Sequence, residues 1–87
     1  MTLGKTPHYT PAQATALVKK VFADRGQPGV TASTKLVDIG YVNEINLLRL
    51  LASINNAIQS PPHGKLQSTE VDNWQYVKDI IASVEKV

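Results

Sequence analysis

The chain has 87 residues, of which 43% are hydrophobic and 18% charged, and this composition is typical of one small globular domain, not of a disordered chain. The absence of cysteine excludes a disulfide framework, a thiolate metal site and a cysteine nucleophile. The net charge of +2 is small and its cations are scattered, so charge gives little indication of a nucleic-acid partner.

Residues 1–9 lack an apolar period, so we expect a flexible leader before a single helical domain over residues 10–87. Thr10 suits the N-cap of a helix and Pro11 suits its first turn. Apolar residues then recur with helical period: Ala14, Leu17, Val18, Val21 and Phe22. Gly26 is the predicted stop of this first helix.

Residues 28–42 have no helical period and predict a long loop, which in so small a domain is either functional or held in place by inward side chains. The candidates for inward side chains are Val30, Leu36, Val37 and Ile39.

Asn43 suits the N-cap of a second helix over residues 43–58. One apolar stripe runs along this helix: Leu47, Leu50, Leu51, Ile54 and Ile58. Ile45 and Leu48 widen the stripe, so we expect this helix to pack on two neighbours.

Residues 65–68 allow a single helical turn. The last helix is predicted to begin at Ser68 or Thr69, with Glu70 and Asp72 in its first turn, where acids favour the helix dipole. Its expected buried residues are Trp74, Val77, Ile80, Ile81 and Val84. No segment alternates with a period of two residues. The predicted fold is all-α, a bundle of three main helices with a short extra helix and a long loop between the first two.

The residue types do not predict an enzyme or a metal centre. His8 and His63 lie in predicted loops beside prolines, and we interpret both as solvated. The carboxylates are spread over several elements, and no glycine-rich phosphate loop is present. Trp74 and Tyr76 could form a stacking platform, but Trp74 falls on the apolar side of the last helix, which favours core packing.

Arg49 is the only charged residue between residues 45 and 58 and is expected on the exposed side of the second helix. It either meets an acidic partner or covers apolar surface with its stem. No apolar run approaches the roughly 18 residues of a membrane span, and the N-terminus lacks a hydrophobic signal core, so we expect a cytoplasmic protein.

The motifs "LVDIG" over residues 36–40 and "NEINLLRLLASI" over residues 43–54 resemble the acyl and peptidyl carrier proteins. That family has a long first loop, the pattern Asp-hydrophobic-Gly-x-Asp-Ser-Leu, and a leucine-rich second helix. Ile45 matches the leucine after the serine, and Arg49 matches a frequent arginine of the peptidyl branch. The resemblance covers the chain from Tyr9 onward and implies the carrier-protein fold.

The family's serine carries phosphopantetheine, and Glu44 occupies its position when the hydrophobic phases are matched. A carboxylate cannot form the stable phosphodiester, and its charge repels phosphate. Ser33 and Ser53 are poorly placed substitutes, so no cofactor is expected, and phosphopantetheine only if the alignment at Glu44 is wrong. Glu44 also has a structural interpretation, as an acid that favours the helix dipole.

The resemblance therefore predicts a non-catalytic docking module of a thioester-dependent pathway that makes fatty acids, polyketides or non-ribosomal peptides. The partner would be a biosynthetic enzyme or synthase domain that docks on the second helix. The expected contact residues are Val42, Glu44, Asn46, Arg49 and Ser53. Two alternatives stay open. One is a small helical nucleic-acid binder, although no helix has a basic exposed side, and the other is a homo-oligomer that buries apolar surface of the second helix.

Overall fold

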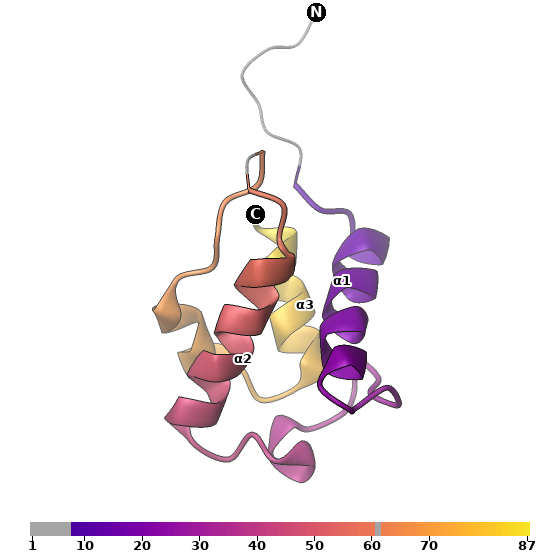
Figure 1. Ribbon diagram of the computed structural model, residues 1–87, viewed down its shortest axis with the longest axis vertical. Coiled ribbons are helices and arrows are strands. Elements are labelled where there is room, and N and C mark those ends of the chain that lie inside the picture. Colours follow the sequence, from indigo (N-terminus) through magenta and orange to yellow (C-terminus); the bar gives the residue numbers. More distant parts are fainter. Residues whose placement is uncertain (1–7, 61) are drawn as a thin grey trace, which may run out of the picture.

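The computed structural model describes residues 8–60 and 62–87, and within them it contains three α-helices and two short 3₁₀ helices. The elements in chain order are α1 (Pro11–Asp24), η1 (Leu36–Ile39), α2 (Glu44–Ala57), η2 (Ser68–Asn73) and α3 (Val77–Glu85). α2 and α3 run in the same general direction and α1 runs against both (Figure 1). The predicted all-α class, with three main helices and a long loop after the first, is confirmed. In the described part of the chain, none of the helices combines the length and apolarity needed to cross a membrane.

α1 begins and ends where local signals predict. The Thr10 hydroxyl accepts a hydrogen bond from the Gln13 amide at 3.2 Å, while the Gln13 side chain accepts one from the Thr10 amide at 3.0 Å. This reciprocal capping box satisfies two amides that the first turn would otherwise leave free. Gly26 follows the helix with φ of +85°, a conformation that favours glycine and ends the helix.

The predicted limits of α2 are also confirmed. The Asn43 side-chain oxygen accepts from the Asn46 amide at 2.9 Å, which caps the helix as expected. The extended backbone of Ile58 ends it. Leu50 and Ile54 are fully buried, so the predicted apolar stripe does face the core.

The last helix begins later than predicted, because η2 and an extended segment come before it. Trp74 and Tyr76 are extended, and the Asp79 carboxylate accepts from the amides of Gln75 and Tyr76 at 2.9 and 2.8 Å. The same segment pairs with the first loop, where the Leu36 amide donates to the Gln75 carbonyl at 2.9 Å. This long-range pairing and the Asp79 cap hold the chain extended until Val77. The short extra helix is η2, not a turn over residues 65–68.

The long first loop is held by inward side chains, but Val37 is not one of them. Leu36 is 2% exposed and Val30 is buried, as predicted, and Ile39 packs partly against the core. Val37 is 58% exposed, so its prediction as an inward residue is wrong. In a 3₁₀ helix, residues three apart share a side, so η1 turns Leu36 and Ile39 inward and leaves Val37 outside.

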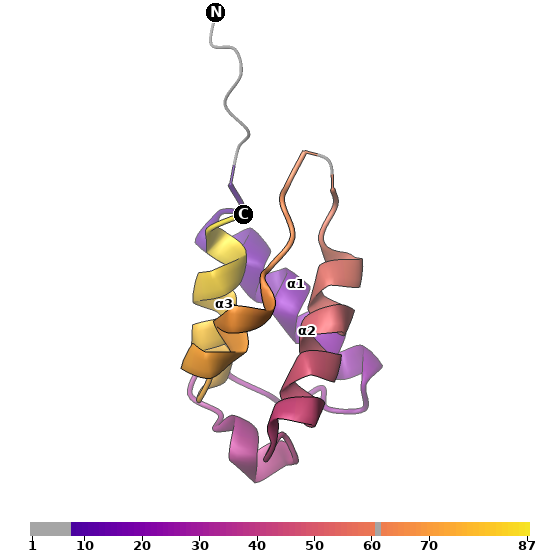
Figure 2. The ribbon, with the colours of Figure 1, turned by 90° about the vertical axis from the view of Figure 1, so that its left-hand side faces the viewer.

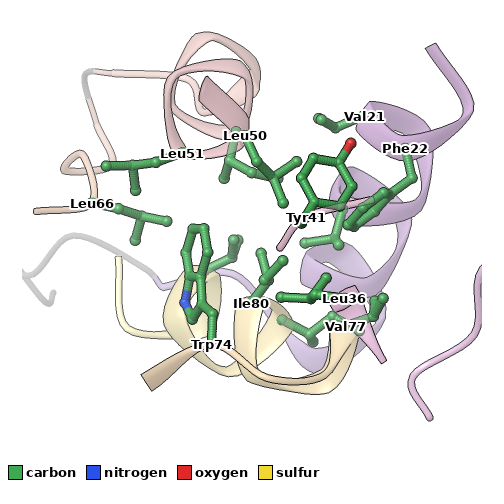
Figure 3. Close-up of a cluster of buried hydrophobic side chains, with 14 of the residues drawn as sticks. Val21, Phe22, Leu36, Tyr41, Leu50, Leu51, Leu66, Trp74, Val77 and Ile80 are labelled. Carbon is green, nitrogen blue, oxygen red and sulfur yellow. The ribbon is translucent and has the colours of Figure 1, made fainter. Parts of the chain in front are cut away.

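The core lies between the three helices, and Figure 3 shows Tyr41 on one side of it and Trp74 on the other. α1 packs against both α2 and α3, and η2 packs against α2. Trp74 is buried, as the core-packing interpretation predicts. Among the described residues, every buried side-chain nitrogen or oxygen has a hydrogen-bond partner. The core therefore contains no unsatisfied polar side chain.

At the opposite end from η1, His63 joins three segments that are distant in sequence. Its Nδ1 lies 2.7 Å from the Val87 carbonyl, and its ring stacks on Tyr9 with centroids 3.8 Å apart. The prediction that His63 is a solvated loop residue is therefore wrong, whereas His8 is exposed as expected. The predicted leader lies outside the described residues up to residue 7, and Tyr9 at its end packs against the core.

Candidate docking surface

The first turn of α2 is the position at which the resemblance places the family's attachment serine. Glu44 is the first residue of the helix and is exposed, directly after the Asn43 cap. Free amides and the helix dipole give this end a partial positive charge, so a carboxylate here is favourable. An exposed group at this position is accessible to a partner, but it offers no hydroxyl for group attachment.

The five predicted contact residues fall into two groups. Val42, Glu44 and Arg49 are exposed, while Asn46 and Ser53 are half-buried. Ser53 belongs to the contact between α1 and α2, because its hydroxyl accepts from Arg25 Nη1 at 2.8 Å and donates to the Arg49 carbonyl at 3.2 Å. The structure therefore does not bring all five residues together on one open surface. Ser53 is also engaged in hydrogen bonds and lies well inside the helix, so it does not replace the missing serine.

Four large apolar side chains are exposed at the end of the molecule where α2 begins: Val37, Val42, Ile45 and Leu48. We call these four residues the outer apolar set. Val42 and Ile45 are each 63% exposed, and Leu48 is 37% exposed. In Figure 2, η1 and the first turn of α2 lie beside each other at this end of the bundle. Single exposed apolar residues are ordinary, and this end is distinguished by having four of them on η1, the segment before α2 and the first two turns of α2.

The prediction that Ile45 and Leu48 widen the buried stripe is wrong, and helix geometry gives the reason. At 3.6 residues per turn, Ile45 lies almost opposite the direction shared by Leu50 and Ile54. Leu48 lies at the margin of the buried stripe, which accounts for its lower exposed fraction. The sequence carried this signal in the angular positions of the residues. The predicted stripe itself follows this spacing, and the error was to add Ile45 and Leu48 to it on apolar character.

The chain before α2 is fixed by a hydrogen-bond network around Tyr41 that the sequence reasoning missed. Arg25 Nε donates to the Tyr41 hydroxyl at 2.8 Å, and this hydroxyl donates to Gln27 Oε1 at 2.8 Å. Gln27 Nε2 in turn donates to the Ile39 carbonyl at 2.7 Å. The buried Tyr41 ring also meets Phe22 edge to face at 5.8 Å between centroids. These contacts join the end of α1 to the end of η1 and fix the position of the chain just before Val42.

A pocket of about 310 Å³ opens between η1 and the extended segment before α3. Its apolar walls come from the buried Leu36, Tyr41 and Trp74 and from the exposed Val37. Its remaining lining residues are Lys35, Gln75 and Tyr76. Because Val37 belongs to both features, the pocket adjoins the outer apolar set.

The Trp74 wall of the pocket is held by a hydrogen-bond chain that begins at the buried indole and ends at the exposed Lys86. Trp74 Nε1 donates to the Ser83 hydroxyl at 2.9 Å, and Ser83 donates to Glu70 Oε1 at 2.6 Å. Lys86 Nζ lies 3.3 Å from the same carboxylate oxygen. The hydrogen bond from Ser83 lowers the pKa of Glu70, and Lys86 lowers it further, although burial acts in the opposite direction. The chain orients the indole and couples η2 to α3.

Within the described ranges no cluster of three histidine or acidic side chains could hold a metal ion. The comparisons with known proteins are also negative. No protein-family model, curated protein or solved structure matches this chain.

Proposed function

We propose that this chain is a carrier-protein-like docking domain without an attachment site, which binds an enzyme or synthase domain of a thioester-dependent biosynthetic pathway. The order of its elements supports the proposal. A first helix, a long loop, a central helix that begins after a Gly40 turn and an Asn43 cap, a short helix and a closing helix follow one another as the resemblance implies.

The outer apolar set is the observation that carries the proposal. It lies on the first loop and the start of α2, which are the parts that the resemblance assigns to docking. A stable domain gains nothing from Ile45 in water, whereas a partner that covers Ile45, Val42 and Leu48 removes apolar surface from solvent. Glu44 and Arg49 lie exposed on the same helix and add polar contacts at the rim.

The loss of attachment chemistry is tested by putting the serine back. The chain and its Glu44→Ser variant are incubated with coenzyme A and a broad-specificity phosphopantetheinyl transferase, and the intact mass is measured. We expect no change for the chain itself and a gain of one phosphopantetheine group for Glu44→Ser. Glu44→Ala is the matched control, since it removes the same charge without supplying a hydroxyl.

Two outcomes would count against the proposal. Modification of the unaltered chain would show that another residue is the attachment site and that the domain is a working carrier. If neither the chain nor Glu44→Ser gains mass, while a known carrier protein is modified in the same mixture, the carrier-like scaffold is refuted.

The outer apolar set also supports a second candidate function, self-association through α2. Sedimentation at increasing protein concentration distinguishes the two, because a homo-oligomer dissociates on dilution and a docking domain stays monomeric without its partner. Ile45→Asp should prevent the association if it occurs. Monomer at every concentration would remove this candidate.

A further inference from the structure

We infer that the outer side of α2 pairs with the same side of α2 in a second copy of this chain, with the two helices parallel and Glu44 of each copy beside Arg49 of the other. This inference rests on the second candidate function, self-association, and adds a direction and a register to it. The occupant of the exposed side of α2 is then the chain itself, so the two matching surfaces can be compared residue by residue.

The exposed apolar residues of α2 follow a helical spacing of their own. Ile45, Leu48 and Ala52 are separated by three and four positions, and all three are exposed. At 3.6 residues per turn, this spacing keeps them on one side of the helix, almost opposite the buried Leu50. We call these three residues the seam. The same spacing repeats along the line where two helices pack in a coiled coil, and the small Ala52 lets a second helix approach closely.

The only two charged residues of α2 lie on opposite flanks of the seam and have opposite signs. Glu44 and Arg49 are both exposed, and they lie about 140° apart around the helix, which is too far for them to pair with each other. Within the described ranges, neither forms an ion pair with another residue. A matching surface therefore offers a cation beside Glu44 and an anion beside Arg49.

A second copy in the parallel direction supplies both charges. When two parallel helices are related by a two-fold axis along the seam, a residue on one flank lies beside the residue five positions later on the facing flank of the other helix. Arg49 follows Glu44 by five positions, so the contact contains this pair twice. The apolar residues match at the same time, since each residue of the seam meets its own equivalent.

The antiparallel direction fits less well. There the two-fold axis crosses the helices, and each flank faces the same flank of the second copy. If Ile45 then meets Leu48, the two Glu44 side chains share one edge of the contact and the two Arg49 side chains share the other, which places like charges together. If α2 pairs along its full length, Ile45 meets the polar Asn56. The charges and the apolar residues therefore both favour the parallel arrangement.

Charge reversal tests the pairing of Glu44 with Arg49. Self-association is measured by sedimentation equilibrium at low ionic strength and up to millimolar protein. Glu44→Arg and Arg49→Glu should each weaken it roughly tenfold or more, because each change turns both attractive pairs of the dimer into repulsive ones. The double variant Glu44→Arg/Arg49→Glu should restore it, since the two charges have only changed places. Lys19→Glu is the matched control, because it changes the net charge as Arg49→Glu does but at an exposed position of α1.

A single introduced cysteine tests the direction. The chain has no cysteine, so Ala52→Cys carries one thiol. In the parallel arrangement this thiol meets its equivalent across the two-fold axis, and air oxidation should link the two copies through a disulfide that a non-reducing gel detects. Ala57→Cys is the matched control, since it makes the same change at an exposed position of α2 about 140° around the helix from Ala52 and should stay unlinked. Circular dichroism of each variant checks that the helices are retained.

The possible failures are distinguishable. Monomer at every concentration would remove the second candidate function and this inference together. Association that both single reversals leave unchanged, or that Ala52→Cys captures no better than Ala57→Cys, would keep self-association and overturn the parallel pairing. The coenzyme A experiment on Glu44→Ser measures none of these quantities, so the carrier-like scaffold is tested independently.

Discussion

Both sides of α2 carry large apolar side chains, but the two sides have opposite surroundings. On the inner side, Leu50 and Ile54 are fully buried against the other helices, whereas on the outer side Ile45 and Val42 next to it are mostly in water. The inner residues stabilise the fold, because burial is what makes an apolar side chain favourable. The outer residues have no such role in the isolated domain, so their apolar character is available for binding. Direction on the helix, and not apolar character alone, therefore separates the buried side from the exposed side.

Truncation of one residue on each side should give the largest difference. Leu50→Ala is expected to lower the free energy of unfolding by about 2–5 kcal/mol, since it leaves a cavity in the core. Ile45→Ala should change it by less than about 0.5 kcal/mol, because no packing is lost. Urea unfolding followed by circular dichroism measures both. Equal destabilisation by the two variants would contradict the assignment of the sides.

The next largest effect is expected for Ser83, the buried polar residue of α3 that bonds to the Trp74 indole. Ser83→Ala removes the partner of the Trp74 indole and leaves that buried donor unsatisfied, which should cost about 1–3 kcal/mol. The same unfolding experiment checks the value. Ala82 lies beside Ser83 and is exposed, so Ala82→Ser serves as a control that adds a hydroxyl on the solvent side and should have little effect.

A smaller effect is expected at Tyr41, which lies between the buried core and the exposed Val42. Tyr41→Phe deletes the hydroxyl that Arg25 and Gln27 share and should destabilise the fold by about 0.5–1.5 kcal/mol, since both partners are near solvent and can bind water instead. Tyr76→Phe is the matched control, because it removes a hydroxyl from another half-buried tyrosine outside this network and keeps the ring that Lys78 Nζ approaches to 5.0 Å. If Tyr41→Phe unfolds no more easily than this control, the network does not stabilise the loop.

The smallest effect should appear as a dependence on pH. The pKa of Glu70 is lower in the folded protein than its usual value, so the carboxylate contributes stability above that usual value and loses it as the pH falls through the folded pKa. The free energy of unfolding of the unaltered chain should therefore fall more steeply below about pH 4.5 than that of Glu70→Gln. Thermal unfolding of both proteins at neutral and acidic pH measures the difference. Parallel pH profiles would rule out this contribution.

The sequence predicts the helices whose limits depend on neighbouring residues. Thr10 and Asn43 cap α1 and α2 through hydrogen bonds to residues three positions away. A short stretch of sequence therefore contains all the residues that determine where these helices begin. The start of α3 depends on pairing between the first loop and the segment around Gln75, which is distant in sequence. No local pattern contains that information, and the prediction placed the helix too early.

The candidate surface was predicted in part for the same reason. Val42, Glu44 and Arg49 are exposed as expected, because they lie on or just before a helix whose period the sequence gives correctly. Val37 was missed because its direction depends on the η1 turn. The pocket was missed because its walls come from residues 35–41 and 74–76, and only the folded chain brings these two segments together.

The contacts of His63 make the two ends of the molecule structurally different. His63 holds Tyr9 and Val87 together at one end, while η1 and the first turn of α2 lie at the other (Figures 1 and 2). A tag, linker or neighbouring domain fused beyond Val87 would emerge at the end of the molecule opposite η1 and the first turn of α2. The domain can therefore be tethered at one end and still present the other end without obstruction, and a surface-immobilised form is suited to testing the proposed docking.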